Sequence, residues 1–152
     1  MNKFKKYLTL FYLPTILVCA CTKVSDEPFY DLTPKIELIE VGNETVVQFT
    51  DSISLTISYE DGDGDLGNAD PDINSIFVKD SRLEIADEYY LGPLAPAGEK
   101  ISINGTLKLN LSPTFLLGNG SEEKMVLTIY VLDRAGNKSN TIETQAITIL
   151  KE

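Results

Sequence analysis

Apolar and polar residues alternate along much of the chain from residue 35 onward. In the segment 53–59, Ile, Leu, Ile and Tyr occupy every second position, and serine or threonine fills the positions between them. The segment 107–111 repeats this pattern with three leucines separated by Lys108 and Asn110. Side chains two residues apart lie on the same face of an extended chain, so both segments are predicted to be half-buried β-strands.

A nearly continuous apolar run covers residues 125–132 and contains β-branched Val, Thr and Ile. It is too short for a typical helix between its flanking turns, and it is therefore predicted to be a central strand. Weaker strand patterns occupy residues 35–41, 44–49, 75–79, 82–90 and 139–150. In the last of these the alternation changes phase near Ala146, which predicts a bulge.

Turn-forming residues separate these strands. Glycine, asparagine, aspartate and proline are concentrated at residues 42–43, 61–67, 92–98, 118–120 and 135–137. No window of eleven residues in this part of the chain keeps the 3.6-residue period of a helix. We therefore predict an all-β fold, an immunoglobulin-like β-sandwich of seven to eight antiparallel strands, with a small closed barrel as the alternative.

The N-terminal residues have the pattern of an export signal. Lys3, Lys5 and Lys6 precede an apolar stretch over residues 7–18, and small residues follow it. This stretch is shorter than the roughly 20 apolar residues that span a bilayer, and Pro14 lies within it. We therefore predict a signal peptide at residues 1–20, a polar tether at residues 21–34 and one sandwich domain at residues 35–152.

The end of this signal, Val18-Cys19-Ala20-Cys21, resembles the lipobox of bacterial lipoproteins. In that family the signal is cut just before a cysteine whose sulfur is then diacylated, which implies lipidation of Cys21. The resemblance further implies a bacterial outer-membrane protein, held at the periplasmic or cell-surface face by its N-terminal lipid. The alternative is ordinary secretion with a free Cys21. Both cysteines of the chain lie at this junction, so the domain is predicted to contain no disulfide.

The charge of the chain limits its partners. It contains 23 acidic and 13 basic residues, and its formal net charge is −10. Removal of the signal peptide would make the charge more negative, because three lysines lie within it. Such a surface repels phosphate backbones, which disfavours nucleic acid and favours cations as partners.

Three aspartates stand at alternate positions in a glycine-rich segment, as Asp61, Asp63 and Asp65. Oxygen ligands on a flexible loop suit Ca²⁺, which takes six to eight of them. The spacing matches the opening of an EF-hand loop, and Asp72 falls at its twelfth position. Leu66 stands where the EF-hand requires glycine, and strands are predicted on both sides, so we exclude an EF-hand and retain calcium. The alternative is a solvated acidic turn without a metal.

The predicted topology adds a fourth aspartate to this group. We assign residues 52–60 to the second strand and residues 124–133 to the sixth strand of an immunoglobulin-like sandwich. The loops that follow these two strands meet at one end of that fold. Asp133 is then expected to face Asp61, Asp63 and Asp65. We take these four as the metal ligands, with Asp72 and Asn137 as additional candidates and a structural role for calcium.

Two motifs carry a family resemblance, the segments Asp-Gly-Asp-Gly-Asp-Leu-Gly at 61–67 and Leu-Asp-Arg-Ala-Gly-Asn-Lys-Ser at 132–139. Together they resemble uncharacterised Bacteroidetes-type lipoproteins with a single immunoglobulin-like domain. The resemblance covers most of residues 35–150. It implies a sandwich fold, export and anchoring, and it implies no particular activity.

The residues that most often carry catalysis are missing. The chain has no histidine, and no cysteine follows Cys21, which removes the usual general base, thiol catalysis and the Ser-His-Asp triad. We predict that the chain is not an enzyme but a non-catalytic binding or accessory module of the cell envelope. The alternative is a purely structural or assembly component without its own ligand. An envelope protein or a glycan is the expected partner, with Tyr89-Tyr90 either as its contact or as ordinary packing.

Overall fold

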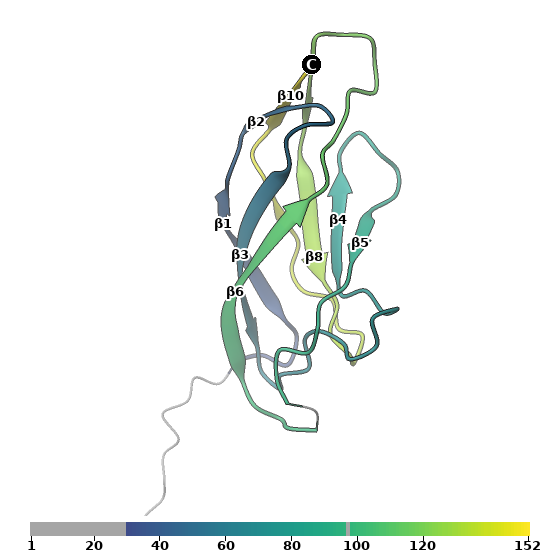
Figure 1. Cartoon of the computed structure of the whole chain (residues 1–152). Coiled ribbons are helices and arrows are strands. Elements are labelled where there is room, and N and C mark those ends of the chain that lie inside the picture. Colours follow the sequence, from purple (N-terminus) through teal and green to yellow (C-terminus); the bar gives the residue numbers. More distant parts are fainter. Residues whose placement is uncertain (1–29, 97) are drawn as a thin grey trace, which may run out of the picture.

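The computed structural model describes residues 30–96 and 98–152, which contain ten β-strands and no helix (Figure 1). The strands are β1 (Lys35–Val41), β2 (Thr45–Val47), β3 (Ile53–Asp61), β4 (Ile76–Asp80), β5 (Asp87–Tyr89), β6 (Ile103–Leu111), β7 (Glu122–Met125), β8 (Leu127–Val131), β9 (Ile142–Glu143) and β10 (Ile147–Leu150). The prediction of an all-β fold is confirmed. Within the described residues, no helix is long and apolar enough to cross a bilayer.

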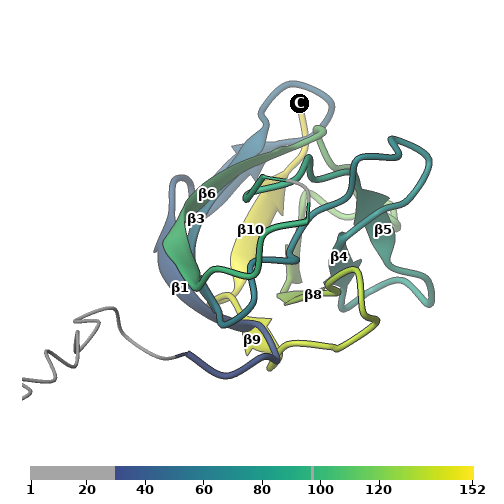
Figure 2. The ribbon, with the colours of Figure 1, turned by 90° about the horizontal axis from the view of Figure 1, so that it is seen from below.

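The strands form two facing layers (Figures 1 and 2). One layer has the order β1-β3-β6, and the other combines the ladders β2-β10-β7 and β5-β4-β8-β9. Only Val126 separates β7 from β8, and only residues 144–146 separate β9 from β10. Counting each interrupted pair as one strand gives eight strands in an immunoglobulin-like β-sandwich, as predicted. The second interruption includes Ala146, where the sequence pattern changes phase.

The N-terminal part of the sandwich departs from the prediction in one respect. β1 pairs antiparallel with β3 in the first layer, but β2 pairs parallel with β10 in the second. The chain therefore crosses between the layers at residues 42–44. Every other strand pair is antiparallel. The predicted strand at 82–90 is also shorter in the structure, because β5 begins only at Asp87.

The ladder between β3 and β6 positions the acidic segment. Nine residue pairs run from Ile53↔Leu111 to Asp61↔Ile103 without a register shift. The alternation that turns Ile53, Leu55 and Ile57 toward the core continues to the last residue of β3. Asp61 therefore lies on the core side of the sheet, where it is fully buried.

Both layers contribute to one apolar core. Its buried members are Ile36, Val46, Ile53, Leu55, Leu66, Ile76, Val78, Leu111, Met125, Leu127, Ile129, Val131, Ile147 and Ile149. Each such side chain stabilises the fold by about 1.5–3 kcal/mol through loss of apolar surface from water. All of them lie between residues 36 and 149, so a chain of residues 22–152 retains the complete core.

Candidate metal centre

The acidic loop that follows β3 is fixed in place by close backbone contacts. The amide of Gly62 donates to the carbonyl of Asp31 at 2.8 Å, and a Cβ at Gly62 would lie 2.4 Å from the carbonyl oxygen of Tyr30. Gly67 has a φ of 82°, and a Cβ there would lie 2.2 Å from the carbonyl oxygen of Gly92. Only glycine fits at these two positions, and it allows the loop to touch the residues before β1 and after β5.

A second loop, between β8 and β9, packs on the acidic loop. Leu66 and Asp133 form an isolated antiparallel bridge, and the amide of Ala135 donates to Oδ2 of Asp65 at 3.1 Å. The Arg134 guanidinium donates to the carbonyls of Gly67 at 2.8 Å and Gly64 at 3.2 Å. The two loops therefore meet at one end of the sandwich, which is the arrangement that the sequence analysis expects.

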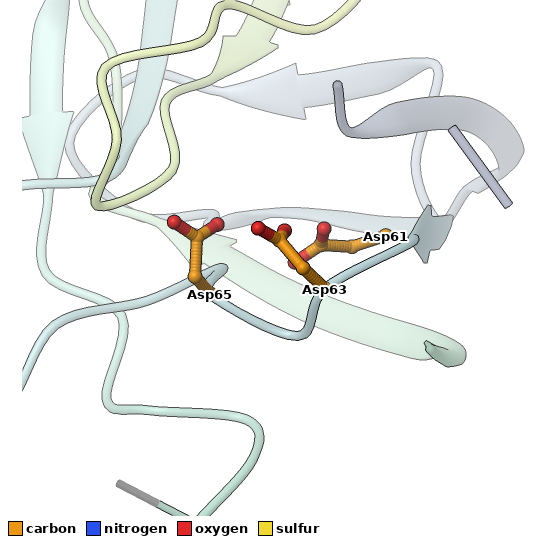
Figure 3. Close-up of side chains that lie close together, drawn as sticks. All are labelled: Asp61, Asp63 and Asp65. Atoms are coloured by element: carbon orange, nitrogen blue, oxygen red, sulfur yellow. The ribbon is translucent and has the colours of Figure 1, made fainter. Parts of the chain in front are cut away.

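Three carboxylates converge within this end. Asp61, Asp63 and Asp65 each offer one oxygen, and these oxygens lie within 4.8 Å of one another. Figure 3 shows the three side chains on the same side of the loop. Oδ1 of each aspartate is buried and has no hydrogen-bond partner. Unpartnered buried carboxylate oxygens are costly, so this geometry indicates a place for a cation.

Asp61 is the most enclosed of the three. Its side chain is 0% exposed, and its Oδ2 accepts a hydrogen bond from the amide of Leu66 at 2.8 Å. Its Oδ1 has no hydrogen-bond partner, and one of its two oxygens belongs to the group of three. This buried oxygen is desolvated without a compensating hydrogen bond, which the clustering of acidic residues alone does not produce.

Electrostatics at the loop oppose the charged state. Burial is the main cause that raises the pKa of Asp61, and the charges of Asp63 and Asp133 raise it further, whereas the backbone amides of Leu66 and Asp63 lower it. The pKa of Asp65 is also raised, mainly by burial and then by the charge of Asp133. A bound cation would remove this repulsion and favour the ionised carboxylates.

Of the other predicted ligands, two adjoin the three carboxylates and one does not. Asp133 is buried beside them, but its Oδ1 and Oδ2 accept hydrogen bonds from the backbone and side-chain nitrogens of Asn137 at 2.7 and 2.8 Å. Asn137 thus orients Asp133 with its donors. Asp72 is exposed in a separate turn, where its amide bonds Asp70. The structure therefore groups Asp61, Asp63 and Asp65, places Asp133 and Asn137 next to them, and leaves Asp72 outside.

The donor set fits a hard cation. The three clustered ligands are carboxylates, and the described part of the chain contains no histidine or cysteine that could add nitrogen or sulfur. Oxygen-only coordination on a glycine-rich loop suits Ca²⁺ better than Zn²⁺ or copper.

Two features of this site were not predicted from the sequence. The burial of Asp61 has a sequence signal, because Asp61 continues the two-residue period of residues 53–59. The clamping role of Arg134 had no sequence signal, because its acceptors are backbone carbonyls more than sixty residues away. Tyr89 packs partly buried against the core, while Tyr90 is 44% exposed. Cys21 lies outside the described residues.

The fold and this loop define the class of protein: a single immunoglobulin-like β-sandwich with three clustered aspartates at one end. No family model, no curated protein and no solved structure matches the chain.

Proposed function

We propose that the chain is a lipid-anchored cell-envelope protein whose sandwich is a non-catalytic binding or accessory module stabilised by calcium. The calcium part is supported by the convergence of Asp61, Asp63 and Asp65, each of which places one carboxylate oxygen within 4.8 Å of the others. Each of the three also has a buried Oδ1 without a hydrogen-bond partner.

Calcium is the cation that this group favours. Ca²⁺ accepts irregular geometry and six to eight oxygens, whereas Mg²⁺ requires a near-ideal octahedron and retains several waters. Three carboxylates supply three negative charges, and backbone carbonyls or water would complete the shell. A cation that binds only the folded state stabilises it by RT ln(1 + [L]/Kd), or about 2.7 kcal/mol at a hundredfold excess over Kd.

The structural consequence of binding would be a brace at one end of the sandwich. The loop that carries the three aspartates already bonds the β8–β9 loop through Asp65 and Ala135. It also bonds the residues before β1 through Gly62 and Asp31. An ion in this loop would therefore stiffen the end of the domain from which the predicted tether leaves.

The anchoring part of the proposal rests on Cys21 and the export signal. Replacing Cys21 by serine in the full chain should move the protein from the membrane fraction to the soluble exported fraction and abolish incorporation of labelled palmitate. Unchanged membrane association of the Cys21→Ser chain would overturn the lipid anchor and leave the calcium proposal intact.

The calcium part is tested by thermal unfolding of residues 22–152 without Cys21. We expect calcium at a hundredfold excess over Kd to raise the melting temperature by roughly 10 °C relative to excess chelator. The binding adds about 2.7 kcal/mol of stability, and each kcal/mol raises the melting temperature of a domain of this size by about 4 °C. The Asp72→Asn variant is the matched control and should keep the full shift. If calcium and chelator give the same melting temperature, the sandwich has no structural calcium.

A further inference from the structure

A group of exposed apolar side chains lies at the end of the sandwich opposite the acidic loop. Phe49, Leu83, Phe115 and Leu117, together called the distal tip, are 65%, 39%, 45% and 48% exposed. They belong to the segments after β2, β4 and β6, which lie together at the top of Figure 1. Clustered exposed apolar residues of this size commonly mark an interaction site.

Charged hydrogen bonds hold the distal tip in position. Arg82 donates to the carbonyl of Phe115 at 3.0 Å, to Oγ1 of Thr114 at 3.0 Å and to Oε2 of Glu123 at 2.8 Å. Glu123 accepts in turn from the amides of Leu117 at 3.0 Å and Gly118 at 2.6 Å. The backbone is thus fixed by polar bonds while its apolar side chains face solvent, which is a preorganised presentation.

The backbone of Phe49 is also held in a fixed conformation. Its φ of 59° lies in the left-handed region that non-glycine residues rarely adopt. Its amide donates to the carbonyl of Thr114 at 2.9 Å, and its ring stacks on Phe115 with centroids 6.0 Å apart. Backbone strain that places an aromatic ring in solvent is typical of functional surfaces.

A small cavity opens within the distal tip. Its volume is about 120 Å³, and Leu83, Phe115 and Leu117 line it together with core residues such as Val78 and Met125. This volume is close to the roughly 150 Å³ apolar cavity that holds one benzene, and it is below the roughly 300–1,000 Å³ of drug-sized ligand sites. The cavity therefore fits one apolar side chain.

The charge around the cavity favours a basic partner. Asp80 and Asp87 line it and Glu123 bonds its wall. Arg82, the one basic residue among them, pairs with both Asp80 and Glu123, so these four groups carry a net charge of −2. A second copy of this acidic tip would bring like charges together, which disfavours self-association. We propose that the distal tip binds a partner polypeptide that inserts one Phe or Leu side chain, flanked by Lys or Arg, into this cavity.

The probe is a library of short synthetic peptides with Phe, Leu or Ser at the centre and Lys, Glu or Ser at the flanks. Binding to residues 22–152 is followed by fluorescence anisotropy. We expect peptides with a central Phe or Leu and Lys flanks to bind, and at least tenfold weaker binding for central Ser or Glu flanks. Leu117→Ser should weaken binding at least tenfold because Leu117 lines the cavity, and Phe49→Ser should do the same because its ring stacks on the lining residue Phe115. Both side chains lie at the surface, so their loss should leave the fold intact.

Leu32→Ser is the matched control, because Leu32 is 54% exposed near the acidic end and should have no effect on binding. The proposal is overturned if no library member binds, if Glu-flanked peptides bind as well as Lys-flanked ones, or if both tip variants bind like the wild type. A dimer detected by light scattering and abolished by Phe49→Ser would overturn it in favour of a second copy. The calcium measurement above is independent of each of these outcomes.

Discussion

The two ends of the sandwich show opposite departures from ordinary packing. At one end, Asp61, Asp63 and Asp65 turn carboxylate oxygens toward one another in a buried position without donors. At the other end, Phe49 and Phe115 expose apolar rings to water. The first end buries charge, and the second exposes apolar surface.

The difference shows that a small sandwich can hold two unfavourable arrangements of side chains at its two ends. Both arrangements are unfavourable by themselves, and both are held by bonds from neighbouring loops: Arg134 and glycine contacts at the acidic end, Arg82 and Glu123 at the distal tip. We infer that each end is completed by a different ligand, a cation at one and a polypeptide at the other.

The largest expected effect concerns the distal tip. Arg82→Ala removes the partner of Asp80, whose side chain is only 10% exposed, together with the bonds to Glu123 and the 112–117 segment. Loss of one partner of a largely buried ion pair should lower the free energy of unfolding by about 3 kcal/mol. Urea unfolding measures this cost, and the calcium-induced shift of the melting temperature should stay unchanged.

The matched control for Arg82 is Lys35→Ala, which removes an exposed ion pair with Glu37 and should leave the free energy of unfolding nearly unchanged. Equal costs for the two variants would mean that the Arg82 network does not hold the tip.

An effect of similar size is expected at the acidic end. Gly67→Ala places a Cβ 2.2 Å from the carbonyl oxygen of Gly92 at a φ of 82°, so we expect a loss of about 3 kcal/mol. Gly136→Ala has a similar φ of 86° but nothing within 4 Å of the added Cβ, and it should cost only about 1 kcal/mol. Urea unfolding of both variants separates close contact from conformational strain, and equal losses would contradict the tight packing of this loop.

A smaller effect should change sign with calcium. Asp63→Asn removes one of three clustered charges, so in chelator it should stabilise the chain by about 1 kcal/mol. In saturating calcium the same variant should be less stable than the wild type, because it has lost a charged ligand. Asp72→Asn should change neither condition. Thermal unfolding of the wild type, Asp63→Asn and Asp72→Asn in calcium and in chelator measures these differences. If Asp63→Asn is more stable than the wild type in both solutions, the loop holds no metal.

The smallest effect is a dependence on pH. Burial raises the folded-state pKa of Asp61 and Asp65 above the ordinary 3.8, so in chelator the folded chain retains protons that the unfolded chain has lost. The contribution of these two groups to the free energy of unfolding therefore falls as pH rises from the ordinary pKa through the raised values. Lowering the pH through the same window restores that contribution.

Calcium should reverse this dependence, because protons compete with the ion for the same oxygens. The calcium-induced shift of the melting temperature should therefore shrink as pH falls through the same window. The measurement compares wild type with Asp65→Asn, which removes one of the two titrating groups. A calcium shift that grows on acidification would contradict the account.

The sequence pattern was sufficient for most of the strands and for the position of the acidic end. The two-residue period of residues 53–59 predicted β3, and immunoglobulin-like topology placed the segment after β8 beside the segment after β3. It was insufficient for the coordination details, because both oxygens of Asp133 are taken by Asn137 in its own turn. These bonds within one turn compete with a metal ion for the oxygens of Asp133.

The distal tip could not be predicted for the same physical reason: contacts from far along the chain decide it. The segment 44–49 has a strand pattern, yet β2 ends at Val47 and Phe49 takes a left-handed conformation that a bond to Thr114 fixes. Arg82 begins a predicted strand, yet its bonds to Asp80 and Glu123 hold it in a turn before β5. Neither contact can be predicted from the local β-propensity of these segments.

Isothermal titration of calcium into residues 22–152 tests the central claim most directly. The account predicts one binding site per chain in the wild type and in Asp72→Asn, and at least tenfold weaker binding in Asp63→Asn. Absence of binding heat in the wild type, together with an unchanged melting temperature in calcium, would contradict it.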